Sequence, residues 1–477
     1  MRGNTVPILS PAWHDRRRFF ADSATGLGAV ALAWMLNEER AAGAGLKPHF
    51  AAKAKRVIHV FSPGGVSQVD TFDHKPDLEK LDGKTLEGKG EIDTFFAVPG
   101  VLRKSFYKFK QHGQSGAWVS DLFPHLSKCV DDIAFLHAMV TKSPSHQPAC
   151  FQMQSGFTLA GFPCLGAWLS YGLGRESDDL PTYVVLPDPR GLVNGGTANW
   201  SNGFLPAEHQ GTLFDMSRPE PVSHLVTPAA VKPDARLAGL KLVRELNAEY
   251  AGQDPLDTSL TARVKSYELA AKMQTSIPEA LTLDGETAKT KQMYGTDHPV
   301  VGPTARNFLL ARRLVERGVR FVQIYNGGAL GSPRINWDAH ENVRDNHDRQ
   351  GLLLDQPCAA LLQDLKQRGM LNDTLVIWST EFGRTPFTQG AAGLGRDHHQ
   401  HCFTSWLAGA GVKPGIRHGS SDELGYKPAR NATSVYDFHA TILHLLGLGH
   451  EKLTFLHNGI QRRLTDVHGQ VIRPILA

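Results

Sequence analysis

The sequence has few cysteines, no excess of one charge and no long apolar run in its body. Its five cysteines, at positions 129, 150, 164, 358 and 402, show no CxxC pair and no dense framework, so neither a zinc knuckle nor a disulfide scaffold is indicated. The 51 Lys and Arg residues against 47 Asp and Glu give a formal net charge of +4, which does not favour a nucleic-acid partner. After residue 45 no stretch reaches a membrane-spanning length, so no transmembrane segment is expected in the mature chain.

The composition is that of a large globular protein with many histidines. Of 477 residues, 41% are hydrophobic and 21% are charged, which is ample for one large α/β domain or a domain with a cap. Histidine occurs 22 times, and neutral imidazole is a common metal ligand. Surface and capping positions account for most of these histidines, yet the excess favours a metal site.

The first 45 residues have the features of an export signal. The pair Arg16-Arg17, followed by Arg18 and Phe19, precedes a weakly apolar run at 26–36 and small residues at 41–45. This pattern is typical of a twin-arginine signal peptide, and the alternative is the basic first turn of an ordinary amphipathic helix. We therefore expect a periplasmic or secreted protein that uses the twin-arginine export machinery. That route carries folded proteins, which agrees with a metal loaded in the cytoplasm.

Strand and helix patterns alternate and predict one α/β domain over residues 56–477. Apolar, β-branched runs predict strands at 56–61, 133–139, 183–186, 319–325 and 374–378. Helical spacing predicts helices at 117–129, 144–156, 304–317 and 347–368, with two or three more at 234–280 in a helical insertion of about 205–300. A loop-rich excursion with a hairpin is expected at 83–116. The order predicts three layers, a mainly parallel sheet with helices on both faces.

Side chains that can bind metals follow three of these strands, at the carboxyl ends where open α/β sheets bind ligands. One group comes after the first strand, one after the strand at 319–325, and two after the strand at 374–378, the second of them in a Gly-flanked loop at 397–399. Carboxylates with imidazoles suit zinc, manganese or similar divalent ions. The alternative for each residue is a salt-bridged loop position or a turn cap. The candidate ligands are Ser67, Asp70, Asp338, His340, Glu381, Asp397, His398 and His399.

Several longer segments resemble a family of exported bacterial proteins of unknown function. They include GGVSQVDTFDHKP, FLLARRLVERGVRFVQ, WDAH, EFGRTP and GRDHH, and together the similar segments cover almost the whole mature chain. Proteins of this family are often described as sulfatase-like and belong to the alkaline phosphatase and sulfatase superfamily. The resemblance implies that superfamily's three-layer fold and its two-metal chemistry on phosphate or sulfate esters.

The resemblance also implies roles for individual ligands. Asp338 and His340 look like the Asp and His of one metal site, with His398 as its third ligand. The ligand after the first strand would be Ser67 or Asp70, although the superfamily normally has an Asp directly after that strand.

Two features depart from the superfamily's pattern. Glu381 stands where the second metal site usually has an Asp, and Phe382 stands where that site has a His. The segment TKSPSH resembles the turn that carries the nucleophile, but Lys142 occupies the nucleophile's place. After a shift of one residue Ser143 or Thr141 could serve, since a hydroxyl beside a metal at a helix start is activated. No Cys or Ser is followed by the Pro and Arg of a formylglycine site, so an ordinary sulfatase mechanism is not expected.

Two functions from different classes remain open. The first is a periplasmic, metal-dependent hydrolase of phosphate or sulfate esters, acting on a small-molecule or polysaccharide substrate. In it Arg384 or His146 would stabilise the developing charge, and the cofactor would be a divalent zinc, manganese or calcium ion. The second is a catalytically reduced relative that acts as an envelope-associated binding protein, which Phe382 and Lys142 favour.

Overall fold

The computed structural model describes most of the chain after its N-terminal segment. The described residues are 48–85, 92, 94–95, 99–222, 231–232, parts of 234–249, 277–329, 334–390 and 393–477. The expected export signal at 1–45 lies outside them, as do most of the helices expected at 234–280. Among the described residues, no helix combines the length and the apolar character that a membrane crossing requires.

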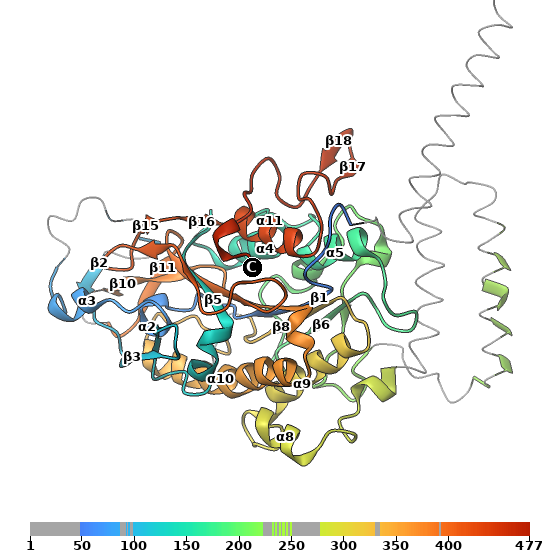
Figure 1. Cartoon of the computed structure of the whole chain (residues 1–477), viewed down its shortest axis with the longest axis horizontal. Coiled ribbons are helices and arrows are strands. Elements are labelled where there is room, and N and C mark those ends of the chain that lie inside the picture. The colour runs from blue at the N-terminus through green and yellow to red at the C-terminus, as the bar shows by residue number, and fades with distance from the viewer. Residues whose placement is uncertain are drawn as a thin grey trace, which may run out of the picture.

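A large sheet forms the middle layer of the fold (Figure 1). Its central strands are short apolar runs that are buried on both faces, as is usual for parallel strands. Of its strands only β12 runs antiparallel to its neighbours, so the predicted mainly parallel sheet is confirmed. In the described part of the chain the order is β13 (Arg417–His418), β5 (Ile133–Val140), β12 (Phe403–Ala408), β9 (Thr374–Ser379), β1 (Arg56–Phe61), β8 (Phe321–Tyr325), β6 (Tyr183–Leu186) and β7 (Thr212–Leu213), with β16 (Thr433–Ser434) beside β5.

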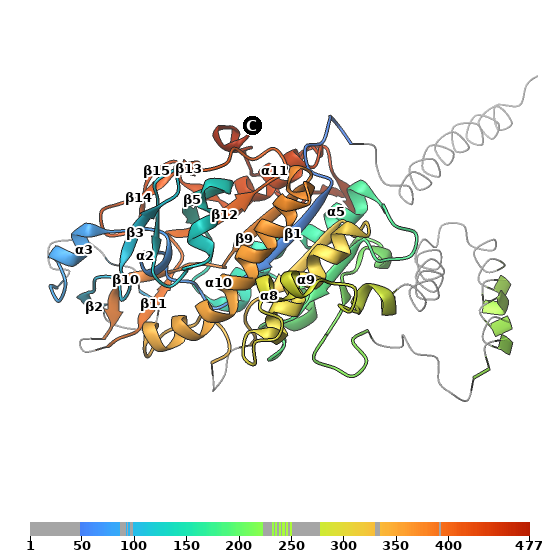
Figure 2. The same ribbon diagram turned by 60° about the horizontal axis from the view of Figure 1, so that its bottom comes forward.

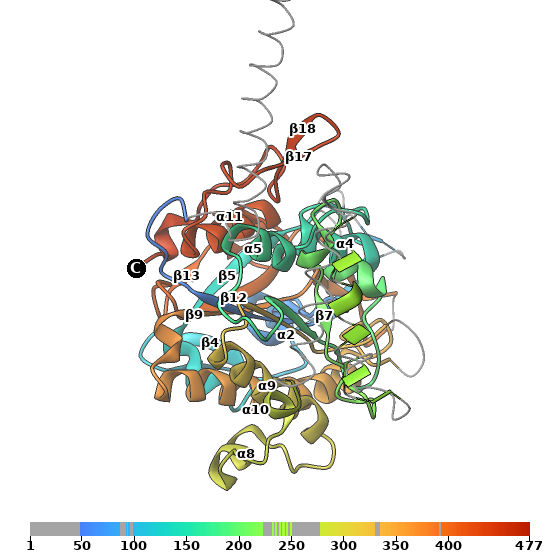
Figure 3. The same ribbon diagram turned by 90° about the vertical axis from the view of Figure 1, so that its right-hand side faces the viewer.

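Helices cover both faces of this sheet, and the end-on view shows the three layers (Figure 3). One face carries α8 (Ala288–Tyr294), α9 (Gly302–Glu316) and α10 (Val343–Gln367), and the other carries α4 (His146–Ser155), α5 (Leu165–Leu173) and α11 (Val435–Leu445). Figure 2 shows α9 and α10 lying across the front of the strands. Along β1, Ile58 and Val60 join the core under α9 and α10, whereas Val57 and Phe61 join the core under α5 and α11. The predicted three-layer α/β fold is therefore confirmed.

A smaller antiparallel sheet stands beside the main one. Its order is β11 (Arg396–His399), β10 (Gly383–Gln389) and β2 (Pro99–Leu102). The sequence predicted a loop at 397–399, and this prediction is wrong, because Arg384 and Gly383 of β10 pair with His398 and His399. Nothing in the polar sequence RDHH indicates a strand, so this strand depends on its partner.

The helix predicted at 117–129 is also wrong. Residues Ala117–Ser120 form β4, which pairs with β3 (Phe109–His112) in a hairpin, and Leu126–Asp132 form the 3-10 helix η1. Pro124 lies between the two elements, and a proline removes a backbone donor from a helix interior.

The remaining elements are short and connect the layers. Of the insertion expected at about 205–300, the described part includes η3, β7 of the main sheet and α8. The predicted helices at 144–156, 304–317 and 347–368 correspond to α4, α9 and α10. The other described elements are α2 (Gln68–Thr71), α3 (Pro76–Lys80), η2 (Gly196–Trp200), η3 (Ala207–His209), η4 (Met370–Asn372), β14 (Ser420–Ser421), β15 (Pro428–Arg430), β17 (Phe455–His457), β18 (Ile460–Arg462) and η5 (Arg473–Ile475).

Candidate metal centre

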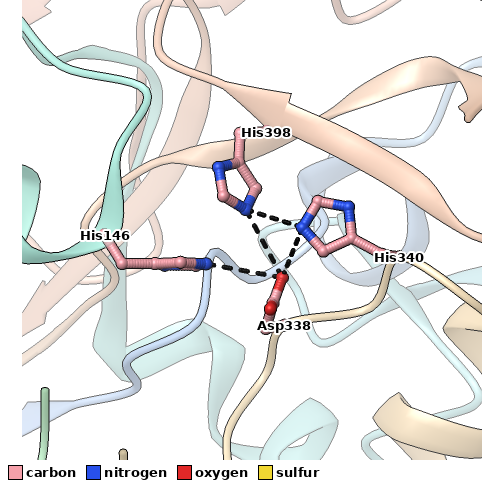
Figure 4. A group of neighbouring side chains, drawn as sticks. All are labelled: His146, Asp338, His340 and His398. Atoms are coloured by element: carbon pink, nitrogen blue, oxygen red, sulfur yellow. Dashed lines mark hydrogen bonds and ion pairs between the residues drawn. The ribbon is translucent and has the colours of Figure 1, made fainter. Parts of the chain in front are cut away.

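Three histidine side chains converge on one carboxylate oxygen of Asp338 (Figure 4). Asp338 Oδ1 lies 2.9 Å from His340 Nε2 and 3.4 Å from both His398 Nε2 and His146 Nε2. The Nε2 atoms of His340 and His398 are 2.8 Å apart. One possible ligand atom from each residue lies within 4.8 Å of every other. We call these four residues the histidine cluster.

Each member of the cluster is placed near the end of a regular element. His146 begins α4, Asp338 and His340 lie between β8 and α10, and His398 belongs to β11. The Trp337 N–H donates to the Pro63 carbonyl oxygen at 2.9 Å, which holds the Asp338 segment against the carboxyl end of β1. The cluster therefore lies at the edge of the sheet where open α/β folds bind ligands.

The turn after β1 requires a glycine at its closest approach to this segment. Gly64 has a φ of +115°, and a Cβ at this position would lie 2.4 Å from the Trp337 nitrogen. Only glycine adopts such a backbone conformation without strain. The Gly64 N–H also donates to Glu381 Oε1 at 2.7 Å, so this turn joins β1 to the segment after β9.

The second ring nitrogen of each histidine faces a hydrogen-bond acceptor. Nδ1 of His146 lies 2.6 Å from a buried carboxylate oxygen, and Nδ1 of His398 lies 2.6 Å from the Pro144 carbonyl oxygen. Nδ1 of His340 lies against Oε1 of Gln389. Because these oxygens accept hydrogen bonds, each Nδ1 carries a proton and donates it, and each Nε2 lone pair points toward the centre of the cluster.

The carboxylate behind His146 belongs to Glu381, which is completely buried. Its Oε1 accepts from His146 Nδ1 and from Gly64 N, and the Thr380 hydroxyl donates to its Oε2 at 3.2 Å. The sequence predicted Glu381 as a direct metal ligand, and the structure places it behind a ring that belongs to the cluster. His146 Nε2 is buried and has no hydrogen-bond partner among the described residues. In this position Glu381 fixes the orientation and the tautomer of His146.

Asp338 is held in its charged form by its surroundings. Burial raises the pKa of Asp338, but the Arg384 guanidinium and the three histidine rings beside it bring it well below its usual range. Burial lowers the pKa of His398 to about 2 despite its contact with Asp338. Burial also lowers the pKa of His146, but the nearby Asp338 and Glu381 carboxylates outweigh burial and leave that pKa raised. A cation bound by Nε2 would therefore compete with a proton at His146.

The guanidinium of Arg384 is completely buried behind Asp338. Its Nε donates to the Gly65 carbonyl at 2.8 Å, and its Nη1 donates to the Arg396 carbonyl at 3.1 Å. Its Nη2 donates to the Gly64 carbonyl and to Asp338 Oδ1, the latter at 2.7 Å. The sequence predicted that Arg384 or His146 would stabilise charge on a substrate. In the structure the donors of Arg384 bind backbone carbonyls and Asp338 instead.

Ser67 and Asp70 lie in a separate buried network. The Ser67 hydroxyl donates to Asp70 Oδ2, and Arg396 Nε donates to the same oxygen at 2.8 Å. Asp70 Oδ1 accepts from the Ser105 hydroxyl at 3.0 Å and from the Phe106 N–H at 2.9 Å. Burial raises the pKa of Asp70, but Arg396 and these hydrogen bonds lower it below its usual range. The structure thus gives Asp70 an arginine as its cationic partner, away from the histidine cluster.

The alternation of β11 separates three candidate ligands that are adjacent in sequence. His398 points into the cluster, whereas His399 Nε2 contacts the Tyr426 carbonyl and its ring stacks on the Tyr426 ring at 4.5 Å. Asp397 accepts from the His398 N–H at 2.8 Å and from the Phe95 N–H at 3.1 Å. The Phe95 ring stacks on the His398 ring with centroids 5.1 Å apart. Asp397 therefore joins the segment over His398 to the strand that carries it.

The two candidate nucleophiles lie in the turn before α4. The Thr141 hydroxyl donates to Gln152 Oε1 at 2.8 Å, and the Ser143 hydroxyl accepts from the Ser145 N–H at 3.2 Å. In the part of the chain that the structure describes, neither hydroxyl makes a hydrogen bond with a residue of the cluster. The turn is nevertheless adjacent to it, because the Pro144 carbonyl accepts from His398 Nδ1.

Sequence reasoning missed two features of this site. His146 was assigned to charge stabilisation. The segment TKSPSH places it at a helix start next to a sheet edge, and this position could have indicated that it joins the other ligands. Sequence reasoning also missed Arg334, which donates to Asp338 Oδ2. Arg334 lies outside regular structure, and no sequence pattern distinguishes it.

The cluster fits a divalent metal ion. Three imidazole nitrogens and one carboxylate oxygen form a donor set that divalent transition metal ions bind. A buried nitrogen without a hydrogen-bond partner, at His146, carries a cost that a bound cation would remove. The orienting acceptors behind the three rings are those expected around metal-binding histidines.

Three solved structures align with most of the chain at low sequence identity. The lipoteichoic acid synthase LtaP from Listeria monocytogenes is 11% identical, with 90% of this chain and 79% of that chain covered and a TM-score of 0.34. The PsFucS1 sulfatase from Pseudoalteromonas sp. is 13% identical, with 89% and 72% covered and a TM-score of 0.33. The C-terminal periplasmic domain of EcEptC from Escherichia coli, in complex with Zn, is 10% identical, with 86% and 88% covered and a TM-score of 0.34. These TM-scores are too low to carry an argument about the activity of this chain.

Sequence comparison gives a family but no characterised relative. No curated protein matches the sequence. One family matches residues 54–476, which include β1 and every residue of the histidine cluster. The match confirms the expected membership in a family of unknown function, and the chain belongs to the family described as "Protein of unknown function (DUF1501)".

Proposed function

We propose that this protein is an exported, metal-dependent hydrolase of phosphate or sulfate esters. The observation that supports the proposal most directly is the convergence of three Nε2 lone pairs on the charged Asp338. Three lone pairs and an anionic oxygen at one point favour a bound cation, because they repel one another without it. Their place at the carboxyl edge of the sheet is where α/β enzymes carry out their chemistry.

His146, Asp338, His340 and His398 would hold the ion, which would supply a Lewis acid toward an oxygen of the ester. The imidazole-rich donor set favours zinc over manganese and calcium, which prefer sites richer in oxygen ligands. The chain's own residues keep the donors in place. Glu381 orients His146, and Arg384 holds Asp338 from the protein side.

Ser143 is the better of the two candidate nucleophiles. The Thr141 hydroxyl is buried and already donates to Gln152. Ser143 is half-buried, and among the described residues its hydroxyl only accepts, from the Ser145 N–H. The hydroxyl proton of Ser143 therefore remains available for transfer as the oxygen attacks an ester.

Metal analysis and an activity panel test the proposal together. Protein purified from the periplasm should contain at least one divalent ion per chain, and His340→Ala should remove most of it. Aryl phosphates and aryl sulfates should be tested with added zinc, manganese and calcium. Metal-free preparations of correctly exported protein would contradict the metal assignment. Loss of turnover in Ser143→Ala at unchanged metal content would support the nucleophile.

A binding protein is the second candidate function. It is favoured by the turn before α4, where neither hydroxyl contacts the cluster in the described structure and Lys142 takes the nucleophile's usual place. The same panel decides between the two. Stoichiometric metal binding without turnover of any ester would leave the envelope-associated binding protein.

Export by the twin-arginine route is part of the proposal and has its own test. Replacing Arg16 and Arg17 by Lys should leave the precursor in the cytoplasm, because the receptor of this route reads the paired guanidinium groups. Cell fractionation with an antibody against the chain measures the effect. Unchanged export of the variant would point to another route.

A further inference from the structure

Two arginines, Arg384 and Arg334, contact Asp338 of the histidine cluster, and Arg396 pairs with Asp70 in the separate network. The side chains of Arg384 and Arg396 are 0% exposed, and each is bound to an aspartate and to backbone carbonyls. The side chain of Arg334 is 29% exposed and contacts the cluster through Asp338 Oδ2. Of these three guanidinium groups, only that of Arg334 is open to a molecule arriving from solvent.

Arg334 and the histidines contact different oxygens of the same Asp338 carboxylate. Oδ1 of Asp338 faces the three Nε2 atoms and Arg384, and Oδ2 receives Arg334 Nη1. An anion at the cluster could therefore reach both the Arg334 guanidinium and the position of the ion. This pairing of a cation with a guanidinium is well suited to a tetrahedral oxyanion.

The remaining donors of Arg334 bind the exposed carboxylate of Glu341, which can separate from the guanidinium. Its Nε and Nη2 donate to the two oxygens of Glu341 at 2.9 Å and 2.7 Å, in a bidentate pair. Glu341 is 69% exposed, so its charge is easily solvated when the pair separates. Phosphate and sulfate present the same two-oxygen edge that a carboxylate presents.

From this geometry we propose that Arg334 binds the anionic group of the substrate and that Glu341 occupies its guanidinium until that anion arrives. The inference rests on the proposed ester chemistry and names the residue that recognises the ester's anionic part. It moves the oxyanion role from the buried Arg384 to the exposed Arg334. Glu341 then acts as an internal competitor, which weakens the binding of small anions to the resting site.

Inorganic phosphate and sulfate are the probes, measured by calorimetry on the zinc-loaded protein. Glu341→Gln should tighten phosphate binding by roughly two- to fivefold, because an exposed ion pair of this kind contributes little and its loss frees the guanidinium. Arg334→Gln should weaken binding by about tenfold or more, and Arg334→Lys should recover only part of it, since Lys keeps the charge without the fork. Zinc affinity is measured for each variant, so that a loss of metal is not taken for a loss of anion binding.

A second exposed pair provides a matched control. Arg317 and Glu279 pair at 3.1 Å with side-chain exposures of 30% and 80%, close to those of Arg334 and Glu341 but away from the cluster. Glu279→Gln changes the net charge by the same amount and should leave phosphate binding unchanged. Equal effects of the two Glu→Gln variants would overturn the inference, as would phosphate affinity that is the same in Arg334→Gln and the wild type.

The outcome is separable from that of the proposed function. Phosphate binding that responds to Glu341→Gln, in a protein that hydrolyses no ester, would keep the anion site and remove the hydrolase. Ester hydrolysis with phosphate binding that ignores both residues would keep the hydrolase and remove this role of Arg334.

Discussion

A single hydrogen bond between Glu381 and His146 determines which ring nitrogen faces the cluster. Glu381→Gln keeps the shape of the side chain and removes the charge that stabilises the Nδ1 proton. We expect metal affinity to fall by roughly ten- to a hundredfold, the usual effect of losing such an orienting partner. Metal titration of wild type and variant, with melting curves alongside, measures it.

The same substitution at an exposed site serves as the control. Glu279→Gln should leave the affinity for metal unchanged. If Glu381→Gln lowers only the melting temperature and leaves metal binding intact, then Glu381 has a purely structural role. In a structural role Glu381 would act through His146 and Gly64, which it contacts. Arg384 would not be its partner, because the Arg384 donors are occupied by Asp338 and backbone carbonyls.

At this scale the family resemblance was informative for three residues that come from two separate segments. Asp338, His340 and His398 were predicted as one set, and the structure brings them together. The burial of Arg384 and the pairing of Asp70 with Arg396 were not predictable, because they depend on which side chains meet across the site. Sequence spacing carries no information on such contacts between remote segments.

At the scale of elements, the turn that ends β1 has no space for a Cβ at Gly64. Gly64→Ala would bring a Cβ to within 2.4 Å of backbone atoms of the Asp338 segment, at a φ of +115°. We expect a loss of stability of roughly 3 kcal/mol or more, because the new Cβ would clash with backbone atoms, which move less readily than the end of a side chain. Urea denaturation measures the change.

Gly83→Ala separates steric conflict from backbone strain. Gly83 also has a positive φ, of +77°, but a Cβ there would meet nothing within 4 Å. Its substitution should cost only about 1–2 kcal/mol, from the left-handed conformation alone. Similar losses for the two variants would show that the approach of β1 to the Asp338 segment is looser than described.

The elements that the sequence predicted well are those whose own residues decide their structure. The apolar, β-branched runs of β1, β6 and β9 form strands wherever they are buried. A hairpin was expected within 83–116, where β3 lies, but the polar strand β11 and the second hairpin strand, β4, were not predicted, because pairing with a partner outweighs their intrinsic preference. His398 belongs to β11, so the strand that completes the cluster was one that the sequence did not predict.

For the molecule as a whole, buried neutral histidines predict sensitivity to acid. Burial lowers the pKa of His59 and His347 to about 3 and that of His439 to about 4, from an ordinary value of 6.5. Because the pKa of each histidine is lower in the folded than in the unfolded state, its contribution to stability is fully present above pH 6.5. That contribution is lost as the pH falls toward the folded-state pKa. Each histidine should cost about 1 kcal/mol per pH unit in that window.

Urea midpoints between pH 7.5 and pH 5, measured with a chelator present, test this prediction. The chelator removes the separate pH dependence of metal binding. His439→Gln should lose less stability over the same range than the wild type, whatever its stability at pH 7.5. A midpoint that stays constant down to pH 5 would contradict the description of these histidines as buried and neutral.

The long sequence separations within the cluster determine when an ion can enter. His398 and the Pro144 carbonyl that orients it are 254 residues apart, and His146 and Glu381 are 235 apart. Such non-local contacts form late in folding, since the intervening loops must close first. An ion bound at the proposed site would therefore be captured only by a largely finished sheet. Free-ion affinities of such donor sets follow a fixed order among the transition metals, so the metal pool of the compartment where the chain folds decides which ion it keeps. With the proposed export in the folded state, that compartment would be the cytoplasm, and the identity of the ion would be settled before the protein reaches its destination.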